Sequence, residues 1–315
     1  MTLHIGIQAD PLSLLDPITD STMLLAREAQ ARGYNLYFYT PEQLYLEEGH
    51  VKALVQKTTL APHNVSPPYE TSAPYIMSLK ELDVVLLRKD PPFDINYILS
   101  TYLIEKLEEH CLVLNSPASI RNFHGKISCS EFTKYLVPYA ITQSLDVLKA
   151  FHAEHKDIIL KPLNAKGGAG VTRILPETSD LKIIYDSFYQ QFPETFILQK
   201  FIPEADIGDK RITFIDGEPA AAILRVPAEA GALANISAGA TAVATELSPI
   251  QTQFCTEIAS HFIKNNLFLV GVDFLGDYLT EINVISPGTL VATNEIYGME
   301  IEKIFWNKIE ARLNR

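Results

Sequence analysis

Residues 271–283 read GVDFLGDYLTEIN, and this stretch decides the fold of the second half of the chain. Two apolar segments flank a central Gly-Asp pair, a pattern that predicts two antiparallel strands joined by a tight hairpin turn. Because side chains alternate between the two faces of a strand, Glu281 and Asn283 share one face, and Asp273 can lie opposite them. Two carboxylates and an amide oxygen are hard oxygen ligands that suit Mg²⁺ together with nucleotide phosphates. The hairpin therefore predicts a metal-binding face, with a plain solvated face as the alternative.

A glycine-rich loop at residues 163–170 follows the apolar segment 157–160. Glycines let backbone amides approach phosphate oxygens without a Cβ clash, so this loop is a candidate phosphate-binding loop. Lys161, at the end of the preceding strand, is placed to reach a phosphate. The loop has neither the Lys-Ser/Thr pair of a Walker A motif nor the third glycine of a dinucleotide fingerprint. A simple turn with a solvated lysine is the alternative interpretation.

The first part of the chain alternates short apolar segments with amphipathic ones. Four segments predict strands: 3–7, 35–39, 82–87 and 112–114. Between the first two, N-cap residues at 20–22 and a C-cap at Gly33 predict a helix. A β-α-β order of this kind predicts a parallel sheet, so we expect a small open α/β domain. The proline-containing segment 44–78 predicts an extended or hairpin excursion from it.

From about residue 123 the pattern changes to an antiparallel α+β one. Residues 211–215 and 220–226 flank an Asp-Gly pair and predict a second hairpin. Residues 228–245 are rich in Ala and Gly and show no clear period. We expect this segment to be a mobile loop of the kind that serves as a lid in compact enzymes.

Composition excludes several classes of function. The chain has 315 residues, of which 47% are hydrophobic and 20% charged, as in a folded protein with more than one core. Its 26 Lys and Arg against 38 Asp and Glu give a formal charge of -12, which repels nucleic acid and anionic lipid. We therefore expect no nucleic-acid and no membrane partner, and a polyanionic small ligand would need a local cluster of Lys and Arg.

The cysteines and the N-terminus indicate the cellular compartment. Three widely spaced cysteines form no CxxC pair, which predicts reduced thiols and neither a disulfide framework nor a structural zinc site. The N-terminus has no basic flank, and no window reaches the roughly 18 apolar residues of a membrane span. We expect a soluble, cytoplasmic protein.

Taken together, several of these motifs resemble the ATP-grasp ligases. They are Lys126, Lys161 with its glycine loop, the segments 199–202 and 208–211, and the hairpin 271–283. Four segments extend the resemblance to the bacterial glutathione synthetases over nearly the whole chain: 8–11, 88–94, 271–273 and 279–287.

The resemblance implies a fold of mixed α/β and α+β class. An N-terminal open parallel sheet domain, a pre-ATP-grasp substrate domain of residues 1–122, would be followed by a two-lobed ATP-grasp domain of residues 123–315. In that domain the lid lobe would cover about 123–200 and the C-terminal lobe about 201–315.

The resemblance also implies a role for each site residue. The residues implied to bind ATP are Lys126, Lys161, Gly167, Gly168, Gly170, Gln199, Lys200, Ile202, Asp209 and Arg211. Those implied to hold Mg²⁺, or Mn²⁺ in its place, are Asp273, Glu281 and Asn283. The catalytic residues implied to border the transferred phosphoryl group are Arg211, Arg225 and Asn235. The implied substrate contacts are Arg88, Asp90, Ser286 and Pro287.

The implied reaction joins γ-glutamylcysteine to glycine through an acyl phosphate, forming glutathione with ADP and phosphate, in a homo-oligomer. Two departures leave the substrate open. Leu233 stands where the family's lid carries an arginine, and residues 288–293 lack an arginine that the family has after its Ser-Pro pair. Both changes remove cationic donors near the expected peptide site. A related ligase with a different peptide or amine, and a nucleotide-binding protein without turnover, are therefore the alternatives.

Overall fold

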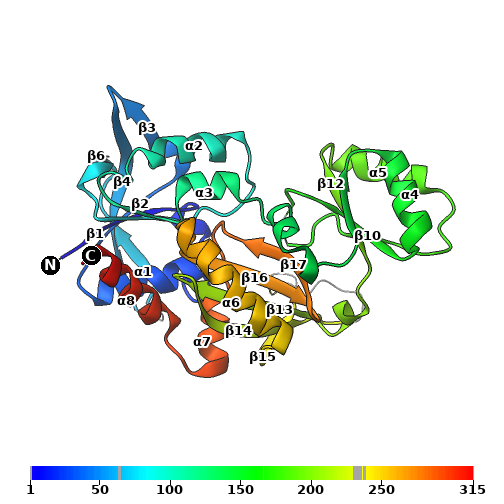
Figure 1. Cartoon of the computed structure of the whole chain (residues 1–315). Coiled ribbons are helices and arrows are strands. Elements are labelled where there is room, and N and C mark those ends of the chain that lie inside the picture. The colour runs from blue at the N-terminus through cyan, green and yellow to red at the C-terminus, as the bar shows by residue number, and fades with distance from the viewer. Residues whose placement is uncertain (1, 63–64, 166, 230–235, 237–238, 315) are drawn as a thin grey trace.

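The computed structural model describes residues 2–62, 65–165, 167–229, 236 and 239–314 of the chain. The described strands form three sheets, of eight, four and five strands. In Figure 1 the eight-stranded sheet lies on the left, the five-stranded sheet at the centre and the four-stranded sheet in a lobe on the right. The chain thus runs from the first sheet out to the lobe and returns through the central sheet.

The N-terminal sheet is built on four neighbouring parallel strands. In spatial order they are β2 (Asn35–Tyr39), β1 (His4–Gln8), β7 (Val84–Leu87) and β8 (Leu112–Leu114). The long strand β4 (His50–Leu60) pairs antiparallel with β2 and carries β3 (Leu44–Glu47), β5 (Tyr69–Thr71) and β6 (Tyr75–Ser78). The predictions of an open parallel sheet and of a hairpin excursion are confirmed.

Helices cover both faces of this sheet. One face packs against α1 (Ser21–Ala31) and against α8 (Ile301–Leu313), and the other packs against α2 (Ile95–Glu105). The predicted N-cap is present, because the Asp20 carboxylate accepts from the backbone N–H groups of Thr22 and Met23. The fully buried Trp306 of α8 donates its indole N–H to the carbonyl of Leu25 at 2.8 Å. The C-terminal helix therefore completes the core of the N-terminal sheet, and it lies beside α1 in Figure 1.

The lobe is a four-stranded antiparallel sheet with helices on one face. Its strands are β11 (Thr172–Ile174), β10 (Ile158–Pro162), β12 (Phe196–Lys200) and β9 (Tyr139–Thr142). The helices are α4 (Leu145–His155) and α5 (Leu181–Gln191). Ile158, Leu160 and Leu198 point into the core that these helices cover, which leaves the opposite face of β10 and β12 free to line a site.

The central sheet is antiparallel throughout. Its strands are β15 (Thr241–Ala244), β14 (Glu218–Val226), β13 (Asp209–Ile215), β16 (Leu269–Leu275) and β17 (Tyr278–Asn283). Both predicted hairpins are present, as β13–β14 and β16–β17. Helix α6 (Pro249–Lys264) packs on one face, where Val272 and Phe274 are fully buried.

The predicted loop at 228–245 contains a strand that the sequence pattern missed. Thr241–Ala244 forms β15 at the edge of the central sheet and pairs with β14. Three of its four residues are exposed and the fourth is half-exposed, so the strand has no hydrophobic period to reveal it.

The remaining elements connect these layers. The other helices are α3 (Pro117–Asn122) and α7 (Leu290–Tyr297). The 3₁₀ segments are Leu12–Leu14, Pro41–Gln43, Leu79–Glu81, Ser128–Tyr135 and Pro203–Asp206. No helix in the described part of the chain has the length and apolarity to cross a lipid bilayer. The three cysteines are free thiols, as predicted.

Candidate active site

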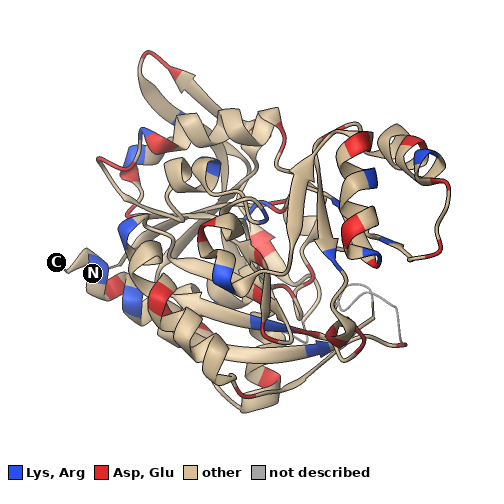
Figure 2. Cartoon of the chain, turned by 45° about the vertical axis from the view of Figure 1, so that its right-hand side comes forward, with Lys and Arg blue, Asp and Glu red and all other residues tan. Residues whose placement is uncertain are grey.

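A cavity of about 500 Å³ lies between the lobe and the central sheet. Strands β10 and β12 supply one wall, and strands β13, β14, β16 and β17 supply the other. Figure 2 shows blue and red segments on strands of the central sheet, whereas the parallel strands of the N-terminal sheet contain no Lys, Arg, Asp or Glu. The strands that border the cavity are therefore more highly charged than the parallel strands of the N-terminal sheet.

Lys161 reaches the cavity because of strand alternation in β10. Ile158 and Leu160 enter the core of the lobe, so Ile159 and Lys161 lie on the other face and line the cavity with Gln199 of β12. Burial lowers the pKa of the Lys161 ammonium, and the nearby Glu281 carboxylate partly opposes that shift. In the described part of the chain the ammonium has no hydrogen bond or ion pair. It is a partly desolvated cation available to an anionic ligand.

Two of the three glycines predicted to bind ATP line the cavity, and the third does not. Gly167 and Gly168 line the cavity and have left-handed backbone conformations, with φ of 68° and 80°. Gly170, also predicted to bind ATP, is not among the lining residues. A Cβ at Gly170 would lie 2.6 Å from the ring of Phe192, so packing within the lobe accounts for this glycine.

Lys126 joins the loop to the central sheet. Its ammonium donates to the carbonyls of Leu163 and Ala165, at 3.1 and 3.3 Å, and to Oε1 of Glu281 at 3.0 Å. A single cation thus bridges the segment after β10 and the carboxylate on β17.

Three charged residues form a row across the central sheet. Arg211 is paired in register with Asp273, and Asp273 with Glu281. Arg211 binds both carboxylate oxygens of Asp273, with Nη2 at 2.7 Å from Oδ2. Gly271 makes room for this pair, because a Cβ there would lie 2.9 Å from Nη1 of Arg211. The bidentate geometry fixes the Asp273 carboxylate toward β13.

A second arginine completes a buried charge network. Arg225 Nε lies 2.6 Å from Oδ1 of Asp209, and Arg225 Nη2 lies 3.1 Å from Oδ2 of Asp273. Burial alone would raise the pKa of Asp273, but the charges of Arg211 and Arg225 outweigh it and lower that pKa to about 2. Burial and the Asp273 charge raise the pKa of Asp209 to about 6 against the opposing charge of Arg225. Asp273 therefore stays ionised throughout the physiological pH range.

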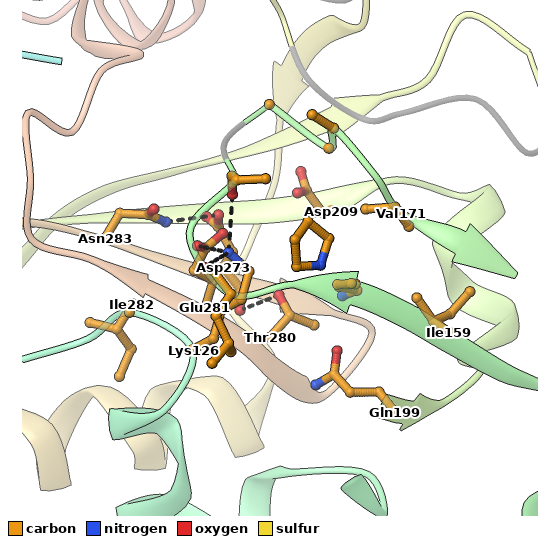
Figure 3. Close-up of a pocket in the computed structure, with 18 of the residues that line it drawn as sticks. Lys126, Ile159, Val171, Gln199, Asp209, Asp273, Thr280, Glu281, Ile282 and Asn283 are labelled. Carbon is orange, nitrogen blue, oxygen red and sulfur yellow. Dashed lines mark hydrogen bonds and ion pairs between the residues drawn. The ribbon is translucent and has the colours of Figure 1, made fainter. Parts of the chain in front are cut away.

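The predicted metal ligands lie together on β16 and β17. Asn283 donates from Nδ2 to Oδ2 of Asp273 at 3.1 Å, which turns its amide oxygen away from that carboxylate. In Figure 3, Asp273, Glu281, Asn283 and Lys126 gather on one side of the pocket, and Gln199, Ile159 and Val171 lie across from them. The described residues include no group of three or more His, Cys, Asp or Glu side chains that could by itself hold a metal ion. Two carboxylates and an amide nevertheless fit Mg²⁺, which usually binds one or two protein carboxylates with waters and substrate phosphates.

The four predicted peptide contacts do not line this cavity in the described structure. Arg88 is buried, and its guanidinium donates to Thr22 Oγ1 at 3.1 Å and to the carbonyl of Pro287 at 3.2 Å. Ser286 donates its hydroxyl to the carbonyl of Arg88 at 3.1 Å, and the Asp90 backbone N–H donates to Asp10. Arg88, Ser286 and Pro287 border a small neighbouring cavity of about 10 Å³. The predicted group is thus assembled beside the main cavity.

Other predicted residues line the cavity or fall outside the described part. Lys200 and Ile202 line it with Gln199, and Asn235 and Leu233 lie outside the described residues. The sequence pattern missed the lining residues His124 and Arg173, and it included Asn164 and Phe201 only as members of the loop 163–170 and the segment 199–202. Arg173 lies over the Phe201 ring at 3.4 Å from its centroid, and the two residues meet because β11 and β12 both pair with β10.

Two family models match the chain. The model described as prokaryotic glutathione synthetase, N-terminal domain, matches residues 3–121, and that for the ATP-grasp domain matches residues 125–298. The chain belongs to the prokaryotic glutathione synthetase family.

Relatives within the family match over their full length. The glutathione synthetase of Rhodopseudomonas palustris is 40% identical over 312 residues, covering 99% of this chain and 99% of that protein. The glutathione synthetase of Brucella melitensis is 38% identical over 312 residues, covering 99% of this chain and 100% of that protein.

Solved structures agree on the fold. The D-cycloserine synthetase DcsG aligns with a TM-score of 0.68 at 13% identity, over 98% of this chain and 99% of that one. The ATP-grasp ligase PsnB aligns with a TM-score of 0.63 at 18% identity, over 98% of this chain and 99% of that one. The prediction of an open parallel sheet domain followed by an ATP-grasp domain is confirmed.

Proposed function

We propose that this member of the glutathione synthetase family uses ATP to join γ-glutamylcysteine to glycine. Membership of the family implies ATP use and small-molecule substrates. The observation that carries the proposal is the shared cavity, which holds Lys126 and Lys161 together with Asp273 and Glu281. The cations suit the phosphates of a nucleoside triphosphate, and the facing carboxylates suit its metal ion.

The chemistry follows from the weakness of a carboxylate as an electrophile. A carboxylate oxygen of the peptide attacks the γ-phosphorus of ATP, the bond to ADP breaks, and an acyl phosphate forms. The glycine amine then attacks the acyl carbon, phosphate leaves, and the amine loses a proton. Phosphoryl transfer of this kind depends on positioning and on neutralising charge at oxygen atoms, and it needs no covalent enzyme intermediate.

Residues at different positions in the cavity would perform these tasks. Lys126 and Lys161 would bind ATP phosphates, with the backbone of Gly167 and Gly168 beside them. Arg211 and Arg225 would stabilise the phosphoryl group in transfer. The adenine and ribose would lie against Gln199, Lys200 and Ile202 on the lobe side of the cavity and against Asp209 on the facing strand β13.

Mg²⁺, or Mn²⁺ in its place, would be held by Asp273, Glu281 and Asn283. The ion would supply charge neutralisation for phosphate oxygens. In the structure the arginines and Lys126 already balance these carboxylates, so the protein keeps the set preformed without strong repulsion.

A second candidate is a related ligase with another peptide or amine. Leu233 and residues 288–293 lack the arginines expected from the family resemblance, so the peptide site has fewer cationic donors. Losing one charge-assisted hydrogen bond costs roughly 1.5–3 kcal/mol, enough to change which carboxylate-bearing substrate binds well.

ADP release and product mass test the proposal together. We expect release only when ATP, Mg²⁺, γ-glutamylcysteine and glycine are all present, with a product mass equal to glutathione. Glu281→Gln should reduce the rate by about 100-fold or more by removing one metal ligand. Release with other peptide or amine pairs only would support the second candidate, and ATP binding without release would refute both.

The proposal extends to assembly and organisation. We infer a cytoplasmic homo-oligomer, with a domain boundary between residues 122 and 123 and two lobes that meet near residue 200. Static light scattering measures the mass of the assembly, and limited proteolysis measures where the boundaries lie. A monomeric mass at assay concentration would contradict the oligomer.

A further inference from the structure

Asn115 lies where the N-terminal sheet meets the central sheet. It directly follows β8, and only 5% of its surface is exposed. It does not line the 500 Å³ cavity but borders the small neighbouring one. Its side chain therefore lies outside the cavity proposed for the nucleotide and the metal ion, and it can affect that cavity only through the backbone that it contacts.

The amide of Asn115 makes four hydrogen bonds, all to the base of the β16–β17 hairpin. Oδ1 accepts from the backbone N–H groups of Phe268 and Leu269, at 2.7 and 2.9 Å. Nδ2 donates to the carbonyls of Leu269 and Val284, at 2.9 and 2.8 Å. These four bonds use both lone pairs and both protons of the amide, so the side chain has one allowed orientation.

The bonded residues flank the proposed metal ligands. Leu269 begins β16, which carries Asp273, and Val284 directly follows Asn283 at the end of β17. The turn after Leu275 joins the two strands at one end of the hairpin, and Asn115 ties them together at the other. The separation of the two strands is thus set from both ends.

We propose that Asn115 is a positioning residue, which holds β16 and β17 at the spacing that lets Asp273, Glu281 and Asn283 bind one metal ion. The inference rests on the proposed metal role of those residues. It also links the two halves of the protein, because the residue that sets the metal hairpin is anchored in the N-terminal sheet. Groups that orient metal ligands commonly change metal affinity by about 10–100-fold when they are removed.

Asn115→Ala removes all four bonds, and Ser119→Ala is its matched control. Ser119 lies at the same junction, but its hydroxyl donates to the carbonyl of Asn265, outside the two strands. In metal-free, nucleotide-free protein we expect hydrogen–deuterium exchange of the peptides covering 268–271 and 281–284 to rise by about tenfold in Asn115→Ala only. This readout does not depend on turnover.

The second readout is the Mg²⁺ concentration that gives half-maximal ADP release. It should rise by about 10–100-fold in Asn115→Ala, with the KM for glycine within about twofold of wild type. Unchanged exchange and an unchanged Mg²⁺ midpoint would overturn the proposal, as would an equal effect of Ser119→Ala. If Asn115→Ala does not fold, the milder Asn115→Ser decides by the same criteria. Wild-type protein without Mg²⁺-dependent ADP release would instead overturn the proposed function.

Discussion

Gly271→Ala tests whether the Arg211–Asp273 pair is needed for activity, without altering either charged residue. The backbone of Gly271 lies outside the left-handed region, so alanine introduces no backbone strain. Its Cβ would nevertheless lie 2.9, 3.0 and 3.1 Å from Nη1, Cδ and Cζ of Arg211. Because these atoms extend from the guanidinium group to the adjoining Cδ, a small rotation of the Arg211 side chain does not relieve the contact. Arg211 has to move away from Asp273.

The magnitude follows from what the displaced arginine loses. Arg211 gives Asp273 two charge-assisted hydrogen bonds, each worth roughly 1.5–3 kcal/mol. Both charges stay in the protein and Arg225 still contacts Asp273, so we expect a loss near 3 kcal/mol in transition-state stabilisation. That loss corresponds to about a 100-fold lower kcat. The free energy of unfolding should fall by about 2 kcal/mol, since a buried ion pair is weakened but not left with one partner.

The assay is steady-state ADP release combined with chemical denaturation. Gly49→Ala is the control, because Gly49 has φ of 82° in the β3–β4 turn and no neighbour within 4 Å of an added Cβ. It should lower stability by about 1–2 kcal/mol through backbone strain while kcat stays within twofold of wild type. Comparable stability losses with different activities would separate the site effect from general destabilisation.

A double-variant cycle gives the decisive comparison. If Gly271→Ala acts by moving Arg211, then adding it to Arg211→Gln should lower kcat by less than about threefold further. Independent, multiplicative losses would refute the displacement argument. So would a folded Gly271→Ala protein that keeps more than half of the wild-type kcat.

Three further predictions address other parts of the molecule. Burial lowers the pKa of Lys161 below the usual 10.5, so its charge is lost at a lower pH than that of an exposed lysine. We therefore expect kcat/KM for ATP to fall as the pH rises through that pKa. The Lys161→Arg variant should not show this fall, because arginine stays charged. A pH profile that is identical in the two proteins would contradict the assignment. Gly170→Ala should lower the unfolding free energy of the protein by more than about 1 kcal/mol, because Gly170 has a φ of 73° and an added Cβ would contact Phe192. The KM for ATP should change less than twofold. A raised KM at unchanged stability would show instead that Gly170 belongs to the nucleotide site. Trp306→Ala should lower the unfolding free energy by about 3–5 kcal/mol, measured by denaturant titration, because it empties a fully buried site and removes the indole hydrogen bond to the Leu25 carbonyl.

Local patterns were sufficient for the elements that carry the site. The β16–β17 hairpin was predictable because its alternation and its Gly-Asp turn lie within 13 consecutive residues, 271–283. The placement of Lys161 was predictable from its position at the end of an apolar strand, directly before a glycine-rich loop. Edge strand β15 was not predictable, since its short, largely exposed sequence has no hydrophobic period.

Pairings between distant segments could not be predicted from these patterns. Arg211 meets Asp273 because β13 pairs with β16, strands that helix α6 separates along the chain. The packing of α8 against α1 joins Trp306 to Leu25, residues 281 positions apart. Such contacts depend on tertiary packing, on which periodicity carries no information. For the same reason the family resemblance named Arg211 and Asp273 as separate site residues without indicating that they bind each other.

The charge of the cavity connects composition with function. The chain as a whole has 26 Lys and Arg against 38 Asp and Glu. The described residues that line the cavity reverse this ratio: the cations are Lys126, Lys161, Lys200, Arg121, Arg173, Arg211 and Arg225, and the anions are Asp206, Asp209, Asp273 and Glu281. A compact polyanion can fit inside the cationic cavity, whereas an extended polyanion would also lie along the acidic surface around it and be repelled there. A nucleoside triphosphate is compact enough to fit inside the cavity and a nucleic acid is not. The negative net charge of the chain is therefore compatible with a phosphate-binding site.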